Sequence, residues 1–238
     1  MVRIARILGA SRAPLAGDAR ERGSAPRSAA GRVTGGRRGF ASLLEADARR
    51  GRVPGVDPQK PLPFEGGLLV ARPELFDPNF RRTVVFLSSH DEEGTLGFIL
   101  NRPTGQPLSE FVGDQAELAP LADVPVYLGG PVGTGQLLLA VLEWGAEGRL
   151  LLRHNLPVSE LVALSGSPAV SVRAFVGHSG WSAGQLDGEM AQGSWLLVKP
   201  SRWLIEPPAC HGAWHRILRG QGPWFRLMSG MPDHPEWN

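Results

Sequence analysis

The tripeptide Asn101-Arg102-Pro103 carries the side chains with the greatest chemical potential in this chain. The guanidinium of Arg102 offers a rigid fork of N–H donors that fits a carboxylate or a phosphate, and Asn101 can cap or close a turn. A second interpretation uses Arg102 inside the fold, where it pairs with an acid such as Asp77 and locks the segment around that acid. Because buried polar groups need partners whatever the function, we favour the internal role over ligand binding.

The segment Gly177-His178-Ser179-Gly180 resembles the sharp turn of a nucleophile elbow. That motif is G-x-S-x-G, but residue 181 is Trp. The chain also lacks the regular strand–helix series of the α/β-hydrolases. The sequence therefore predicts a tight turn over 177–180 whose glycines allow Trp181 to pack, and we do not expect a hydrolase.

Two further patterns resemble binding sites, but each lacks a required group. His211 and His215 could share a helical face and bind a transition metal, but a third ligand is needed, and only Cys210 is adjacent. The stretch 129–135 is rich in glycine, yet Pro131 removes one amide and no Lys follows, as a phosphate loop requires. We therefore expect no metal and no cofactor, and we expect 129–135 to be a turn that ends a strand.

Hydrophobic patterning predicts the elements that position these residues. Apolar and β-branched runs predict strands at 67–72, 83–89, 96–100, 124–128, 136–143, 150–153, 169–176 and 195–198. Helical patterns predict short helices at 108–112, 158–164, from 182 or 183 to 192, and 209–218, followed by a Pro-rich tail. Strands dominate and the helices are interspersed, which indicates an α+β fold and not a doubly wound βαβ sheet.

Charge divides the chain into two parts. Residues 1–52 hold twelve Arg and four acids, a net charge of +8, whereas residues 53–238 hold thirteen basic and nineteen acidic groups, a net charge of −6. A segment rich in Gly, Ala, Ser, Pro and Arg buries too little apolar surface to fold alone. Residues 1–60 are therefore predicted to be a disordered basic leader and Pro-rich connector, whether a solvated tail, a transit-type leader or a mis-assigned start.

The predicted single domain then spans residues 61–238. Its acidic character argues against direct nucleic-acid binding by the folded part, because a nucleic-acid backbone is itself negative. The chain contains one cysteine, Cys210, which excludes an internal disulfide framework. No apolar run approaches the roughly 18 residues that span a bilayer, so we expect a cytoplasmic protein that does not bind membranes.

Five segments of the domain form an ordered series. They read LLVARP from Leu68, DPNFRRTVV from Asp77, GFILNRP from Gly97, VYLGGPV from Val126, and GHSGW from Gly177 with Gln185, Leu186, Asp187 and Trp195 beyond it. In this order and spacing they resemble the YqgE/AlgH family, also called UPF0301 or DUF179, over about residues 65–205. The chain departs from the family pattern at His178, where many members have Tyr, and at Asp187, where Glu is usual.

The resemblance implies a single α+β domain with a mixed, bifurcated sheet that curls into a pseudo-barrel, with short helices packed outside. It implies no established enzymatic activity. We therefore expect a non-catalytic binding or regulatory domain for an unknown protein or a small anionic ligand, with a surface that joins Asn101, Arg102, Gly129, Gly130, His178, Trp181 and Gln185. Two alternatives remain open: an enzyme that acts on a small anionic substrate in a groove near Arg102 and His178, and a transcriptional regulator, the label that some family members carry.

Overall fold

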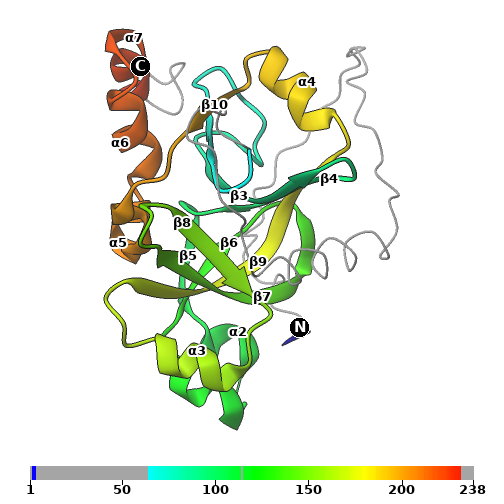
Figure 1. Ribbon diagram of the computed structural model, residues 1–238, viewed down its shortest axis with the longest axis vertical. Coiled ribbons are helices and arrows are strands. Elements are labelled where there is room, and N and C mark those ends of the chain that lie inside the picture. The colour runs from blue at the N-terminus through cyan, green and yellow to red at the C-terminus, as the bar shows by residue number, and fades with distance from the viewer. Residues whose placement is uncertain (1, 4–63, 114, 232–238) are drawn as a thin grey trace, which may run out of the picture.

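The computed structural model describes residues 2–3, 64–113 and 115–231, and the predicted leader and connector lie outside these ranges apart from residues 2–3. The described residues form a ten-stranded mixed sheet that lies at the centre of the molecule (Figure 1). Its strands are β1 (Val2–Arg3), β2 (Leu68–Ala71), β3 (Val84–Asp91), β4 (Gly94–Ile99), β5 (Pro103–Pro107), β6 (Pro125–Leu128), β7 (Val132–Trp144), β8 (Leu150–His154), β9 (Val170–Ser182) and β10 (Trp195–Val198).

Short helices pack outside this sheet. They are α2 (Ser109–Val112), α3 (Val158–Leu164), α4 (Gln185–Ala191), α5 (Pro207–Cys210), α6 (Ala213–Arg219) and α7 (Pro223–Ser229), with 3₁₀ turns η1 (Ala116–Leu121) and η2 (Arg202–Ile205). In Figure 1 the helices α5, α6 and α7 form a column along one side, α4 lies at the top, and α2 and α3 lie at the bottom. The predicted α+β class with a curled, branched sheet and outer helices is confirmed.

The long strand β9 is the point at which the sheet branches. Its first part pairs antiparallel with β7 and parallel with β6, and its last residues pair antiparallel with β4. The β7–β9 register shifts between Val132 and Leu137, and Gly177 opposite this shift has φ +67. A left-handed glycine at an irregular register kinks a strand and increases its twist, so β9 can belong to both arms of the sheet.

One prediction for this region is wrong, and a second holds only in part. The segment 177–180 is not a turn, because β9 continues through it to Ser182. The glycine-rich stretch 129–135 follows the end of β6 at Leu128 as predicted, but its last four residues already belong to β7, which begins at Val132. Pairing with β4 and with Val132 of β7 keeps residues 178–182 in the strand, whereas residues 133–136 fall within the register shift of β7.

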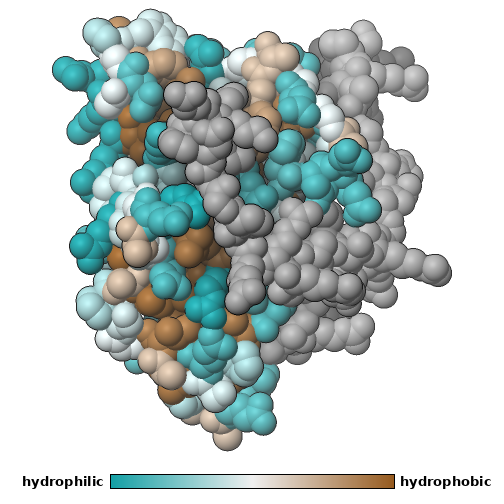
Figure 2. All heavy atoms as spheres, viewed as in Figure 1, coloured by the Kyte–Doolittle hydropathy of each residue, from teal (hydrophilic) through white to brown (hydrophobic). Residues whose placement is uncertain are grey.

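Two hydrophobic cores lie on the two faces of the sheet. One is built by β2, β3, β4 and β10 together with side chains of α5 and α6. The other is built by β6, β7 and β9 together with α2, η1 and α3. Figure 2 shows hydrophobic residues gathered over the lower part of one face, where β7, β8 and α3 lie in Figure 1. The sheet therefore packs against apolar side chains on both faces.

The C-terminal region differs from its prediction. The helix predicted over 209–218 is two helices, α5 and α6, and α7 lies in the segment predicted to be a Pro-rich tail. Pro223 occupies the first turn of α7, where a missing amide hydrogen costs nothing. Trp214 fixes α6 to the sheet, since its indole N–H donates to the carbonyl oxygen of Ala71 at 2.6 Å. Among the described helices none has the length and apolar character needed to cross a membrane.

Candidate functional site

Residues 77–83, called the 77–83 loop below, form a compact projection between β2 and β3. The carboxylate of Asp77 accepts a hydrogen bond from the amide of Asn79 at 2.7 Å, and its carbonyl accepts from the amides of Phe80 and Arg81. The hydroxyl of Thr83 donates to the carbonyl oxygen of Phe80 at 2.7 Å. The sequence DPNFRRT thus encodes a turn with its own internal bonds, as Asp, Pro and Asn favour.

Arg102 holds this loop against the sheet. Its guanidinium donates to the carbonyl oxygens of Asn79 at 2.7 Å, Pro78 at 3.1 Å and Arg81 at 3.1 Å. Burial lowers the pKa of Arg102, an effect that the negative charge of Asp77 opposes. The internal role predicted for Arg102 is the one its contacts describe, but its bonded partners are backbone carbonyls and Asp77 acts through its charge.

Asn101 fixes the exit of the same loop. Its side-chain oxygen accepts from the amide of Val84 at 2.8 Å, and its side-chain amide donates to the carbonyl oxygen of Arg82 at 2.8 Å. Arg82 has φ 55, a conformation that a residue with a side chain adopts at a cost. Asn101 therefore offsets a strained backbone where β3 begins.

Trp181 and Gln185 meet in an aromatic cluster at the tip of the loop. The ring of Phe80 stacks on Trp181 with centroids 5.7 Å apart and meets the edge of Trp195 at 5.4 Å. Both indole N–H groups donate to one carboxylate oxygen of Glu189, at 2.9 and 2.8 Å. Gln185 donates to the other oxygen at 3.1 Å.

Sequence reasoning missed Glu189. One available signal was its position four residues after Gln185, which places both on one face of α4. The carboxylate works as an acceptor for two indoles and so fixes the surface on which the ring of Phe80 packs. Its contacts are therefore those of a structural residue.

Gly129 and Gly130 lie where β6 ends against β9. A Cβ atom at Gly130, which has φ +152, would overlap the backbone of His178. A Cβ at Gly177 would come within 2.6 Å of the carbonyl oxygen of Gly130. The hydroxyl of Ser179 donates to the carbonyl oxygen of Gly129 at 3.1 Å. Glycine is needed at this place, called the crossing of β6 and β9 below, because the two backbones approach each other closely. The hydrogen bond of Ser179 lies at the same crossing.

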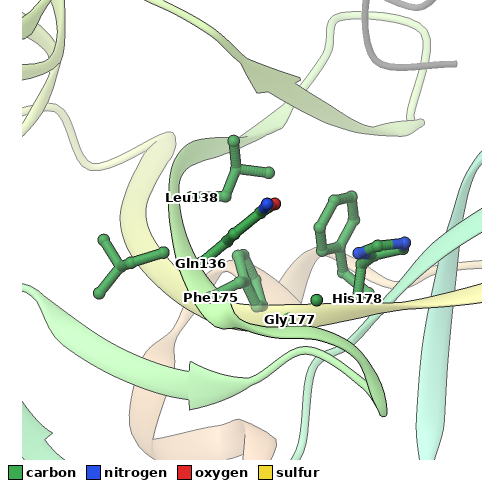
Figure 3. A pocket seen from close by; sticks show the side chains of 8 residues that line it. Gln136, Leu138, Phe175, Gly177 and His178 are labelled. Atoms are coloured by element: carbon green, nitrogen blue, oxygen red, sulfur yellow. The ribbon is translucent and has the colours of Figure 1, made fainter. Parts of the chain in front are cut away.

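His178 lies in the wall of a small niche between β7 and β9. Figure 3 shows its ring and the side chain of Gln136 at this niche, beside Phe175 and Gly177. The cavity measures about 10 Å³, which is room for about one water molecule. Burial lowers the pKa of His178 to about 4, so its ring is neutral at pH 7 and offers no positive charge to an anion.

The lowered pKa of His178 predicts a pH dependence of stability. The unfolded chain takes up this proton near pH 6.5 and the folded chain only near pH 4, so the free energy of unfolding falls as pH drops through this window. The loss should reach roughly 2–3 kcal/mol. Urea denaturation of the wild type and His178→Tyr between pH 7.5 and 4 checks this, and equal slopes in the two proteins would contradict it.

Arg173 is a buried cation that sequence reasoning did not single out. It is fully buried and donates to the carbonyl oxygen of Leu204 at 2.6 Å, to the hydroxyl of Ser171 at 3.1 Å and to the sulfur of Cys210 at 3.3 Å. Its guanidinium also lies 5.1 Å from the ring centre of Tyr127. These contacts connect β9 to η2 and α5 through the core.

The metal pattern considered from the sequence does not converge within the described ranges. His211 is exposed, while the thiol of Cys210 is buried and donates to the carbonyl oxygen of Leu204. Across residues 64–113 and 115–231 no three His, Cys, Asp or Glu side chains come together as a metal site.

A larger depression lies beside the first core. This groove, called the 198–221 groove below, measures about 230 Å³ and runs between the end of β10, η2 and α6. Its lining residues are Leu68, Val198, Lys199, Ser201, Trp203, Leu204, Arg216, Ile217 and Gln221. The ionisable side chains among them are Lys199 and Arg216, so both charges that line the groove are positive.

Comparisons with known proteins find relatives that match most of the described residues. A family model described as AlgH-like (DUF179) matches residues 68–226. A UPF0301 protein of Streptomyces coelicolor is 38% identical over 183 residues, which covers 73% of this chain and 94% of that protein. A UPF0301 protein of Chlorobium phaeobacteroides is 33% identical over 188 residues, covering 73% and 95%.

Solved structures show the same fold. The crystal structure of a Corynebacterium diphtheriae protein superposes with a TM-score of 0.57 at 23% identity, covering 73% of this chain and 95% of that one. The solution structure of the AlgH protein from Pseudomonas aeruginosa, also described as UPF0301, superposes with a TM-score of 0.52 at 25% identity, covering 76% and 100%.

Proposed function

Since this chain belongs to the AlgH-like UPF0301 family, and the polar residues of its family motif are bonded to its own backbone, we propose that it is a non-catalytic domain that binds an anionic ligand. The observation that carries the proposal is the contact set of Arg102, whose guanidinium is engaged by three carbonyl oxygens of the 77–83 loop. A guanidinium in that position acts as a structural clamp, because three of its five N–H donors bond to the backbone of the loop.

The other motif residues support a non-catalytic role in the same way. Asn101 bonds to the backbone on both sides of Thr83, and Ser179 donates to a carbonyl oxygen. His178 is neutral at pH 7 and beside a cavity of about 10 Å³. General acid–base catalysis needs a titrating group within reach of a substrate, and a niche of this size admits none.

The anionic class of the ligand is supported by charge. Residues 53–238 carry a net charge of −6, and a protein of that sign repels anions unless cations are gathered locally. Lys199 and Arg216 are gathered at the 198–221 groove. In the described part of the chain neither has a carboxylate within ion-pair distance.

Ligand-detected NMR on the full-length chain tests the proposed function. The panel is inorganic phosphate, short alkyl carboxylates, short alkyl phosphates and the matching neutral alcohols. We expect at least one anion to bind, to bind more weakly as salt rises from about 20 to about 200 mM, and to be recovered chemically unchanged. Conversion of a bound anion would make the protein an enzyme, and failure of every anion to bind would refute the anionic class.

The remaining alternatives stay predictions of the sequence. A protein partner and a role in transcription are each compatible with a binding domain, but the net charge of −6 over residues 53–238 favours neither DNA nor RNA as a direct ligand. We also propose a cytoplasmic location, because a chain with one cysteine lacks the internal disulfide framework that is common in small secreted domains.

A further inference from the structure

We infer that the 198–221 groove is the ligand site and that its ligand is a small amphiphilic anion, with a phosphate or carboxylate head and a short apolar tail. The inference rests on the proposed function and adds to it a place and a chemical class. Both are argued from the two halves of the groove lining, which differ in character.

The inner half of the groove is apolar. Leu68 of β2 and Leu204 of η2 are buried, and Val198 and Ile217 are partly buried beside them. These four side chains come from a strand pair, a 3₁₀ turn and a helix, all elements of the first core. Burial of a ligand's apolar carbons against this floor is favourable. The floor offers no hydrogen-bond partner to a charged atom.

The outer half of the groove is cationic and polar. Lys199, Ser201, Arg216 and Gln221 are exposed, and each can donate a hydrogen bond to an anionic head. Lys199 directly follows β10, and Arg216 projects from α6, so the two cations stand on different elements that border one space. Lys199 is the second of the two lysines in the whole chain.

The contact between Arg216 and Trp203 orients the guanidinium for an anionic group. Its guanidinium carbon lies 4.3 Å from the ring centre of Trp203. A cation–π contact with the ring does not consume the N–H donors of the guanidinium, and these donors match two oxygens of a carboxylate or phosphate. The contact also limits the rotamers of a long side chain, which reduces the entropy lost when a ligand binds.

The volume sets the size of the ligand. The groove measures about 230 Å³, below the range of about 300–1,000 Å³ typical of sites for drug-sized molecules. The ligand should therefore be small, with one anionic head and a short tail, and hexyl phosphate, which joins a phosphate to a six-carbon chain, is a suitable probe.

Calorimetric titration of the full-length chain with hexyl phosphate tests the site. We expect saturable binding, with butyl phosphate roughly tenfold weaker because about two methylene groups leave the apolar floor. Inorganic phosphate and hexanol, which supply the head or the tail alone, should each bind at least tenfold more weakly. Hexyl phosphate should also shift the indole N–H resonance of Trp203, assigned through Trp203→Phe.

Three variants locate the binding. Arg216→Met and Lys199→Met should each weaken hexyl phosphate at least fivefold, whereas Arg219→Met, on the same helix but outside the groove, should change it less than twofold. All three residues are exposed, and thermal unfolding verifies that each variant is folded. Binding that survives both groove variants unchanged would overturn this site and leave the proposed function standing.

Two further outcomes separate the inference from the proposed function and from a membrane source. If another anion binds and hexyl phosphate does not, the ligand class inferred here is wrong while anion binding stands; if no anion binds, both fail. Flotation with phosphatidylcholine vesicles containing phosphatidic acid distinguishes a lipid headgroup from a soluble ligand. Retention on these vesicles without binding of hexyl phosphate in solution would overturn the inference.

Discussion

Gly130→Ala should cost more than about 4 kcal/mol of unfolding free energy, or yield no folded protein. Two penalties act together. The residue has φ +152, which side chains rarely adopt, and the new methyl group would overlap the backbone of His178. Neither strand can move aside cheaply, because Ser179 bonds to the carbonyl of Gly129 at this crossing and β9 is paired along its length.

Gly135→Ala is the matched control for this substitution. It lies in the same glycine-rich segment, but a Cβ there has open space, so the change should alter the free energy of unfolding by less than about 1 kcal/mol. Chemical denaturation with circular dichroism measures both variants. Similar stabilities for the two would show that the crossing of β6 and β9 does not depend on glycine at residue 130.

Arg102→Gln should lower the free energy of unfolding by about 3–4 kcal/mol. The substitution removes three hydrogen bonds from a charged donor to the carbonyls of residues 78, 79 and 81, and such bonds contribute about 1.5–3 kcal/mol each without adding fully. The loop should also detach locally, so the amides of Phe80 and Thr83 should exchange with solvent faster than those of β7.

Arg219→Gln is the control, because Arg219 is exposed at the end of α6 and has no bonded partner in the described part of the chain. It should change stability by less than about 0.5 kcal/mol. Equilibrium unfolding in urea and native-state hydrogen exchange compare the two variants. If the amide of Phe80 exchanged at the wild-type rate in Arg102→Gln, Arg102 would not be the residue that holds the loop against the sheet.

Elements bounded by clear local signals could be predicted from sequence. The helix α3 at 158–164 follows Pro157, and the strand β10 at 195–198 follows Gly193, and both have the predicted bounds. The family resemblance was likewise carried by local motifs and is confirmed by the AlgH-like model over residues 68–226.

Features that depend on distant partners could not be predicted. The glycine at 177 signals a turn locally, but the pairing of β9 with β4 and β7 keeps the chain extended. Glu189 acquires its role only when α4 places it between two indoles. Arg173 became a core residue because Leu204, thirty-one residues away, provides a carbonyl acceptor.

The candidate sites also include features that the sequence could predict and features that it could not. The sequence identified Arg102 as chemically capable and favoured an internal role. Its carbonyl acceptors could not be predicted, because they lie more than 20 residues away in the chain and no local pattern joins them to Arg102. The 198–221 groove was missed because its lining comes from β2, β10, η2 and α6, and no short motif joins these elements.

The affinity of Arg102→Gln for hexyl phosphate, measured at a temperature at which the variant is folded, tests the central claim most directly. If Arg102 stabilises the fold and the ligand binds at the 198–221 groove, the dissociation constant of the variant should stay within about twofold of the wild-type value. Its free energy of unfolding should fall by about 3–4 kcal/mol. A loss of affinity of tenfold or more with stability unchanged would place the ligand at Arg102 and contradict the account.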